Sequence, residues 1–323
     1  MLKYSLTRIL TMIPMLIGIS IMCYFIIDLA PGDASDMYFN PEIMAAHPEY
    51  MEQVREQLGL DKPVYVRYVR WLNELVHGNF GYSYYSKRPV WTELKARIGI
   101  TVLIASLSIF LEFLIGLAIG ILCAKHQNKP PDYIFSTLAV IGHCVPAFWL
   151  ALVMILVFAI KLKWLPSTGL YTPKLANASL GIRFMDRVKH LVLPVTVTAV
   201  SGIGSKARQM RSSYLDVMNQ DYIRTARAKG VGERAITWTH TFRNACIPIL
   251  TMMSGILPAL IGGSFILESI FGIPGLGFYG TEAILKHDYP VIMATIMFSS
   301  LLVMVGTLIV DILYVLVDPR VKL

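Results

Sequence analysis

The chain has 323 residues and a formal net charge of +8 at pH 7, with 55% hydrophobic but only 15% charged residues. Soluble domains carry about 25% charged residues, so this composition excludes an ordinary soluble protein and predicts a core that largely faces lipid. In a membrane protein, basic loops orient the spans, and the sequence has no basic and aromatic groove motif, so we expect no nucleic-acid partner.

Six apolar runs are long enough to cross a bilayer, which takes about 20 apolar residues. The first follows Lys3 and Arg8. It is longer than the apolar core of a secretory signal, so we expect an uncleaved helix whose N-terminus is cytoplasmic. The expected spans are residues 9–30, 98–124, 134–160, a fourth that begins near Leu191, 247–270 and 291–317.

The segments between the runs complete the predicted topology. Residues 31–96 are too polar to insert, and Val66, Val69, Leu72 and Val76 recur at helical spacing, which predicts a small external domain between the first and second spans. The fold class is therefore an all-α membrane protein with six transmembrane helices and both termini in the cytoplasm. Residues 97–317 form its transmembrane domain with an inner loop at 219–246, and residues 318–323 form a cytoplasmic tail.

Two features inside the runs concern packing. Gly116 and Gly120 form a GxxxG pattern, which permits close helix contact but is common in apolar helices, and Pro146 lies inside the third run. The four cysteines lie in or beside apolar runs, with no CxxC pair and no histidine at ligand spacing, so we interpret them as small buried hydrophobic residues and expect no metal site. They are Cys23, Cys123, Cys144 and Cys246.

Motifs for catalysis are absent from the sequence. The string nearest to a phosphate-binding P-loop, Gly202-Ile203-Gly204-Ser205-Lys206, has the wrong spacing, so the chain has no nucleotide site of its own. No G-x-S-x-G or HExxH motif and no paired cysteine and histidine cluster occurs. We therefore expect no catalytic residues in this chain.

The inner loop is the most informative stretch. Residues 221–229 are good helix formers, Asn219 is placed to cap their start, and Gly230 to Gly232 would stop the helix. A second helix would begin at Glu233 and lead to Pro248. Two helices and a glycine turn predict a compact knob across the membrane face. The alternative is a solvated basic loop that only sets topology or binds anionic lipid headgroups.

The run from Arg224 to Gly230 resembles the E-A-A-x-x-x-G loop of ABC-importer permease subunits. Arg224 stands where the wider family has its glutamate, and Pro248 follows the glycine later than in many such permeases. Both departures resemble the peptide and nickel branch. The other stretches similar to this branch are Tyr4, Arg8, Leu10, Ile13 and Pro14, then Ala30–Asp33, Leu58–Ser83, Gly262–Gly277 and Val317–Leu323.

The resemblance covers essentially the whole chain and is specific to the B-type permease of dipeptide and oligopeptide importers. It implies a peptide substrate, a prokaryotic plasma membrane, a heterodimer with a C-type permease subunit, two ATP-binding subunits and an extracytoplasmic substrate-binding protein. It also implies no cofactor on this chain, because ATP and magnesium belong to the partner ATPase subunits. One alternative is the same machinery importing nickel or a metal chelate. Another is an ion-coupled secondary transporter, which would need inverted repeats and broken half-helices; the sequence shows no repeat.

In the family that this chain resembles, the inner loop is the coupling helix that docks into a groove of an ATPase subunit. We expect Tyr222, Ala226 and Val231 to supply apolar contact and the basic side chains to steer docking. The candidate coupling residues are Tyr222, Arg224, Thr225, Ala226, Arg227, Gly230, Val231 and Gly232.

Ionisable residues at membrane depth are costly and face a bundle interior or a cavity. We expect Glu112 and Asp311 to pair between helices and His143 to be a satisfied interior histidine. Glu268 leads into a glycine-rich loop that should line the outer mouth; it has either a functional role or a hydrogen bond that pins the loop. The candidate translocation-path and outer-gate residues are Glu268, Phe271, Pro274, Gly275, Leu276 and Gly277.

Overall fold

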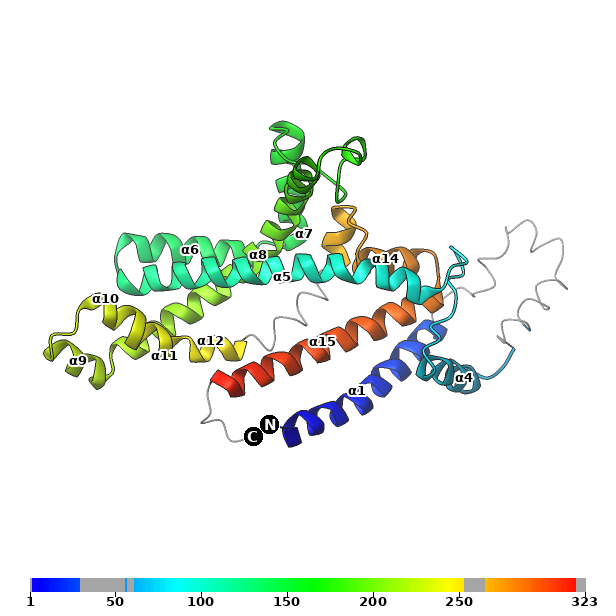
Figure 1. Cartoon of the computed structure of the whole chain (residues 1–323), viewed down its shortest axis with the longest axis horizontal. Helices are drawn as coiled ribbons and strands as arrows, with labels where there is room; N and C mark the ends of the chain where they lie inside the picture. The colour runs from blue at the N-terminus through cyan, green and yellow to red at the C-terminus, as the bar shows by residue number, and fades with distance from the viewer. Residues whose placement is uncertain (1, 30–55, 57–60, 253–264, 318–323) are drawn as a thin grey trace. The chain divides into compact units, whose positions relative to one another are not determined.

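The computed structural model describes residues 2–29, 56, 61–252 and 265–317, and helix is the dominant regular structure in them (Figure 1). The described residues contain no strand beyond one isolated antiparallel bridge, between Tyr82 and Pro89. These features confirm the all-α fold class.

Several of these helices are long and apolar enough to cross a membrane. Within the described ranges there are four, or five if one bent pair counts as a single span. The expected span at 247–270 includes residues 253–264, which lie outside the described residues, as do the tail at 318–323 and most of 31–60. The six-span count and the external domain therefore stay predictions. The four helical spans are Leu6–Leu29, Val90–Lys125, Leu180–Met218 and Tyr289–Val310.

The chain divides into two compact units, of which the first comprises residues 1–101 and 274–305. Its elements are α1 (Leu2–Leu29), α4 (Val64–Val76), the start of α5 (Val90–Lys125), α14 (Leu276–Leu285) and the first part of α15 (Tyr289–Val317). Apolar residues of α5, α14 and α15 form its core: Val90, Leu94, Leu276, Tyr279, Ala283, Val291, Ile292 and Ala294.

A buried carboxylate anchors the segment that precedes α5. Asp288 is almost fully buried and accepts hydrogen bonds from the Ser83 hydroxyl at 2.5 Å and from the Tyr84 backbone N–H at 3.0 Å. A buried charge is tolerated only when it is satisfied in this way, so the contact fixes residues 83–85 on the first unit.

The second unit comprises residues 102–273 and 306–323. It holds most of α5, followed by a series of helices of very different length. They are α6 (Pro130–Cys144), α7 (Ala147–Met154), a π-helix (Ile155–Lys161), a 3-10 turn (Pro173–Leu175), α8 (Leu180–Met218), α9 (Asp221–Ala228), α10 (Glu233–Ala235), a second π-helix (Ile236–Phe242), α11 (Arg243–Ala245) and α12 (Ile247–Met252).

The expected third span, at 134–160, is broken in the structure. Its two halves, α6 and the helix that starts at Ala147, meet at an angle of 101°. Pro146 lacks a backbone N–H, and it forces Val145 out of the helical region to φ −72° and ψ 126°. The third run is therefore a broken helix pair, with the break at Val145 and Pro146.

Two further expectations are corrected. The helix that contains the fourth span, α8, already begins at Leu180, within the stretch expected to be an outer loop. Of the four cysteines, Cys123 is buried but Cys144 is exposed on this chain, so the expectation of four buried cysteines is wrong.

Close packing of α8 against α5 and α6 dominates the second unit (Figure 1). A Cβ atom at Gly116 would lie 2.7 Å from Lys206 Cβ, and one at Gly120 would lie 2.6 Å from the Ala207 carbonyl oxygen. On the α6 side, a Cβ at Gly204 would lie 2.2 Å from the Ala139 carbonyl oxygen. The GxxxG pattern of α5 therefore marks a real helix contact.

We predict that Gly120→Ala lowers the stability of the protein. Its methyl group would lie 2.6 Å from Met210 Cβ and from the Ala207 oxygen, and overpacking of this kind costs about 1–3 kcal/mol. Gly99→Ala is the matched control, because it lies in the same helix with nothing within 4 Å. The apparent Tm of the detergent-purified protein should fall for Gly120→Ala only; equal shifts would contradict the tight contact.

Candidate functional site

The polar segment between α8 and α12 contains a short helix, α9, that begins at Asp221 as expected but has a different N-cap. Gln220, not Asn219, is its N-cap, and no side chain caps it. Asn219 instead ends α8, with its backbone N–H donating to the Leu215 carbonyl at 3.2 Å. The predicted cap at Asn219 is therefore wrong, because α8 continues up to the residue before it.

Gly230 ends α9 in the way that the sequence predicts. Its φ of +79° lies in the left-handed region, which favours glycine. The Gly230 N–H donates to the Arg227 carbonyl at 2.9 Å, and the Val231 N–H donates to the Ala226 carbonyl at 3.1 Å. These two bonds form a Schellman motif. Gly232 has φ −63°, so only the first glycine is required by the backbone.

An exposed ion pair joins the residues on the two sides of this turn. Arg227 Nε and Nη2 donate to the two carboxylate oxygens of Glu233 at 2.6 and 3.2 Å. This hydrogen bonding raises the pKa of Arg227 and holds the pKa of Glu233 below its usual value. The guanidinium is thus engaged within the chain, and its first role is to hold the end of α9 against the start of α10.

Buried side chains hold α9 on the second π-helix, which in turn packs on α8. Ile223 and Ile236 are fully buried, and Asn244 donates to the Tyr222 hydroxyl at 3.1 Å. Beneath them, Tyr214 of α8 belongs to a core cluster that also includes Ala245 of α11. We call residues 219–246, held together in this way, the knob.

The candidate coupling residues divide into exposed and structural ones. Arg224 is exposed and lies 3.8 Å from Asp221 of the preceding turn. Ala226 and Val231 are only partly exposed, and their backbone groups pair in the Schellman motif. The exposed candidates are Tyr222, Arg224, Thr225, Arg227, Gly230 and Gly232.

A second ion pair, which sequence reasoning missed, lies between the start of α6 and α8. Arg211 Nε and Nη2 donate to the two oxygens of Asp132, each at 2.7 Å. The nearly buried carboxylate also accepts from the Asn128 backbone N–H at 3.0 Å and from the Ser136 hydroxyl at 3.3 Å. The only local signal was an acid in the first turn after Pro130 and Pro131.

Glu112 makes the helix-to-helix pair expected for it. Lys206 Nζ of α8 lies 3.3 Å from its Oε2, and both side chains are buried. A Cβ at Gly202 would lie 2.1 Å from the Glu112 carboxyl carbon, so α8 has no side chain where that carboxylate sits. Within the described part of the chain, no three His, Cys, Asp or Glu residues are grouped to hold a metal.

The expectations for two other ionisable residues, His143 and Asp311, are not confirmed in the described structure. His143 is exposed on this chain, with Nδ1 2.8 Å from the Ser201 carbonyl oxygen, so its expected interior position is wrong. Asp311 lies within α15, but its side chain is outside the described residues.

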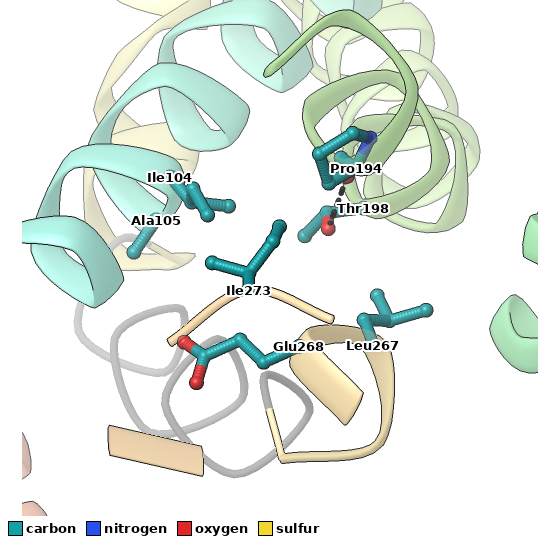
Figure 2. Close-up of a pocket in the computed structure, with 7 residues that line it drawn as sticks. All are labelled: Ile104, Ala105, Pro194, Thr198, Leu267, Glu268 and Ile273. Atoms are coloured by element: carbon teal, nitrogen blue, oxygen red, sulfur yellow. Dashed lines mark hydrogen bonds between the residues drawn. The ribbon is translucent and has the colours of Figure 1, made fainter. Parts of the chain in front are cut away.

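Glu268 lies beside a small cavity (Figure 2). Ile273 stands between α5 and α8 in this view, and the Thr198 hydroxyl donates to the Pro194 carbonyl at 2.8 Å. The cavity volume is about 20 Å³. One water molecule needs about 10–15 Å³, so this space cannot hold a peptide. The lining residues are Ile104, Ala105, Pro194, Thr198, Leu267, Glu268 and Ile273.

The end of the helix at residues 265–270 repeats the geometry found at Gly230. Gly272 has φ +58°, its N–H donates to the Ser269 carbonyl at 3.2 Å, and the Ile273 N–H donates to the Glu268 carbonyl at 2.8 Å. The neighbouring Phe271 carbonyl accepts from the Gly169 N–H at 2.8 Å. Glu268 and Phe271 are thus held in a closely bonded turn.

Two of the four remaining gate candidates belong to helix rather than loop. Leu276 and Gly277 begin α14, and the Leu276 N–H donates to the Thr101 hydroxyl at 2.9 Å. The expectation that they lie in an irregular loop is therefore wrong. Of the six gate candidates, Pro274 alone is exposed on this chain, and the others are buried within it.

Comparison with protein families gives two matches. Residues 116–323 match the family described as "Binding-protein-dependent transport system inner membrane component". Residues 1–105 match "Binding-prot-dependent transport system membrane comp, N-term". The two matches together span nearly the whole chain.

Relatives of similar length carry transport names. The oligopeptide transport system permease protein AppB of Bacillus subtilis is 41% identical over 323 residues, which cover 100% of both chains. The glutathione transport system permease protein GsiC of Salmonella paratyphi A is 37% identical over 322 residues, covering 100% of this chain and 99% of the relative.

A solved structure shares the fold. An inward-facing form of the MetNI methionine ABC transporter aligns with a TM-score of 0.58 at 18% identity, covering 71% of this chain and 98% of that chain. At this identity the likeness concerns fold alone. The alignment agrees with a helical transmembrane domain, and the part of this chain that does not align is additional to the shared fold.

We predict that Arg227→Gln loosens the knob whereas Arg224→Gln does not. The first change removes the pair with Glu233 across the turn, and the second removes an exposed contact at 3.8 Å. Hydrogen exchange measured by mass spectrometry should show faster exchange at Gly230 and Val231 only in Arg227→Gln. Equal exchange in the two variants at pH 7 would contradict the role of the pair.

The same pair predicts a pH dependence. The folded-state pKa of Glu233 is lowered by Arg227. Its stabilisation is therefore complete above the ordinary glutamate pKa of about 4.3 and is lost as the pH falls through the lowered value. The difference in exchange between the unmodified protein and Arg227→Gln should vanish there; a difference that persists below that pH would show that the ion pair is not its cause.

Proposed function

Because the chain belongs to the family of binding-protein-dependent transport system inner membrane components, we propose that it is the permease subunit of an ATP-driven importer. It receives di- or oligopeptides from an extracytoplasmic binding protein and passes them across the plasma membrane of a prokaryote, with both termini in the cytoplasm. The names of its full-length relatives support this substrate class. The chain itself is a multi-pass helical membrane protein.

The proposed assembly contains a C-type permease as the second half of the pathway and two ATP-binding subunits. Those subunits bind ATP and magnesium and carry out hydrolysis, and this chain relays their movement. The observation that carries the proposal is the knob, a braced polar helix pair at the end of the longest helix in the described residues.

The contacts support transmission from the knob into the membrane. α9 packs on the second π-helix, and that π-helix packs on α8. α8 in turn packs without intervening side chains on α5 at Gly120 and on α6 at Gly204. A displacement of α9 by an ATPase subunit therefore moves a closely packed three-helix group rather than a flexible loop, and packed groups switch between discrete arrangements.

One observation favours the alternative of an ion-coupled secondary transporter. The bend at Pro146 is a broken helix pair, which ion-coupled transporters use at their binding sites. An ion-coupled transporter that works alone does not need the knob, whereas a separate ATPase subunit needs a surface on which to dock. The family likewise pairs this chain with a binding protein. The import of a metal chelate by the same machinery differs only in the cargo.

We predict that proteoliposomes containing the four-subunit assembly take up peptide only when both the binding protein and ATP are supplied. Ionophores that collapse ion gradients should leave the rate unchanged. Uptake by this chain alone, driven by an ion gradient, would refute the proposal. Mass spectrometry of the ligand carried by the binding protein separates a peptide from a metal chelate.

We also predict that Gly230→Leu abolishes uptake while the amount of protein in the membrane is unchanged. Leucine in the left-handed region costs about 1–2 kcal/mol, which would distort the end of α9. Gly181→Leu, outside the knob, is the matched control, because a Cβ at either glycine meets nothing within 4 Å but the φ of Gly181 lies outside the left-handed region. Normal uptake by Gly230→Leu would count strongly against the coupling role.

A further inference from the structure

The short helix α4 packs directly on the C-terminal part of the first span (Figure 1). Three kinds of contact join them. The hydroxyls of Ser20 and Tyr68 lie 2.9 Å apart and are buried. The Tyr24 ring lies 5.5 Å from the Tyr68 ring and 5.8 Å from the Trp71 ring, and Arg67 donates to Asp28. α4 is therefore a fixed neighbour of α1.

These contacts place α4 at a definite depth in the bilayer. The apolar span covers Leu6–Leu29. At 1.5 Å per residue, Tyr24 lies about 10 Å and Asp28 about 16 Å from the middle of that span. The hydrocarbon of a bilayer extends about 15 Å from its midplane. α4 thus lies at the boundary between acyl chains and headgroups.

The order of the contacts also sets the rotation of α4. From Ser20 outward to Asp28, the partner on α4 changes from Tyr68 to Arg67. Successive residues are about 100° apart around a helix, so Tyr68 marks the side toward the membrane centre and Arg67 the side toward water. Around the helix, the side of Tyr68 that is farther from Arg67 faces the membrane centre. It consists of Tyr65, Val69, Leu72 and Val76.

That face is apolar, and nothing in the described residues covers most of it. Tyr65, Val69 and Val76 are 64%, 62% and 77% exposed, and Leu72 is partly exposed. The opposite side carries Arg70, Asn73 and Glu74, which are exposed.

On the side of α1 that carries Ser20 and Tyr24, the apolar residues toward the membrane centre are also exposed, and α4's apolar face adjoins this lipid-facing surface; they are Leu10, Ile13 and Ile17. We propose that α4 is an interfacial membrane helix whose Tyr65, Val69, Leu72 and Val76 rest on lipid acyl chains. Its aromatic rings lie at headgroup level, where Tyr and Trp are enriched, and its arginines reach toward water.

The proposal needs only that α1 spans the membrane, so it does not depend on the substrate or on the coupling role. A helix in this position ties the outer end of the first span to the surface of the leaflet. The segment expected to be wholly external would then have part of its mass in the bilayer.

The test is the accessibility of spin labels in the whole assembly in lipid nanodiscs. Single cysteines replace Val69 or Val76 on the apolar face, and Arg70 or Glu74 on the polar face as matched controls, in a cysteine-free background that retains uptake. The measured quantity is the ratio of the collision rate with oxygen, which concentrates in lipid, to that with a water-soluble nickel complex. This ratio should be several-fold higher for labels at Val69 and Val76 than for labels at Arg70 and Glu74.

Other outcomes overturn the proposal. Labels at Val69 and Val76 that the nickel complex reaches, and that are protected when the binding protein is added, would make this face a protein-docking surface. Labels that neither reagent reaches would mean that protein covers it. If the cysteine-free background fails to fold, tryptophan fluorescence replaces the labels. The contribution of Trp71 is the difference in emission between the unmodified protein and Trp71→Phe. Lipids brominated high on their acyl chains should quench this contribution, and an absence of quenching would refute the placement.

Discussion

The contact between α8 and its two neighbours is the constraint on which the second unit depends. Glycine removes the side chain at Gly120 on α5 and at Gly204 on α8, where a single added carbon would collide with backbone or Cβ atoms. In a membrane, van der Waals packing of this kind replaces the hydrophobic effect between helices. Because the knob is continuous with α8, its position relative to α5 and α6 is fixed by the same contacts.

Two ion pairs with buried carboxylates follow from this close packing. Glu112 with Lys206 joins α5 to α8, and Asp132 with Arg211 joins α6 to α8. Such pairs are weak evidence for net stability, because removing both charges from water offsets much of their attraction. They specify partners well, since any other register would leave a charge buried alone. We interpret them as devices that set how the helices align.

The sequence predicted the features that depend on local chemistry. Long apolar runs, the glycine turn at Gly230 and the pairing of Glu112 all arise from residues close in sequence or from the cost of charge in lipid. The bend at Pro146 was missed because proline is tolerated in many membrane helices, and only the surroundings decide whether the chain breaks there.

Long-range partners were beyond what local chemistry could predict. Asp132 and Arg211 are 79 positions apart, and nothing in either neighbourhood names the other. The gate candidates were misjudged for a related reason. A Gly- and Pro-rich composition predicted an irregular loop, whereas Gly272 and Gly275 flank a short turn and leave Leu276 free to begin a helix.

The ion pairs also restrict how the protein can change shape. Moving α8 away from α6 would leave Asp132 buried without its partner, at a cost of about 3–5 kcal/mol. A motion that carries α5, α6 and α8 together retains both pairs and every glycine contact. α7 also packs on α8, so the break at Val145 and Pro146 does not separate α7 from this group. A change of shape that keeps all of these contacts therefore moves α5, α6, α7 and α8 as one body.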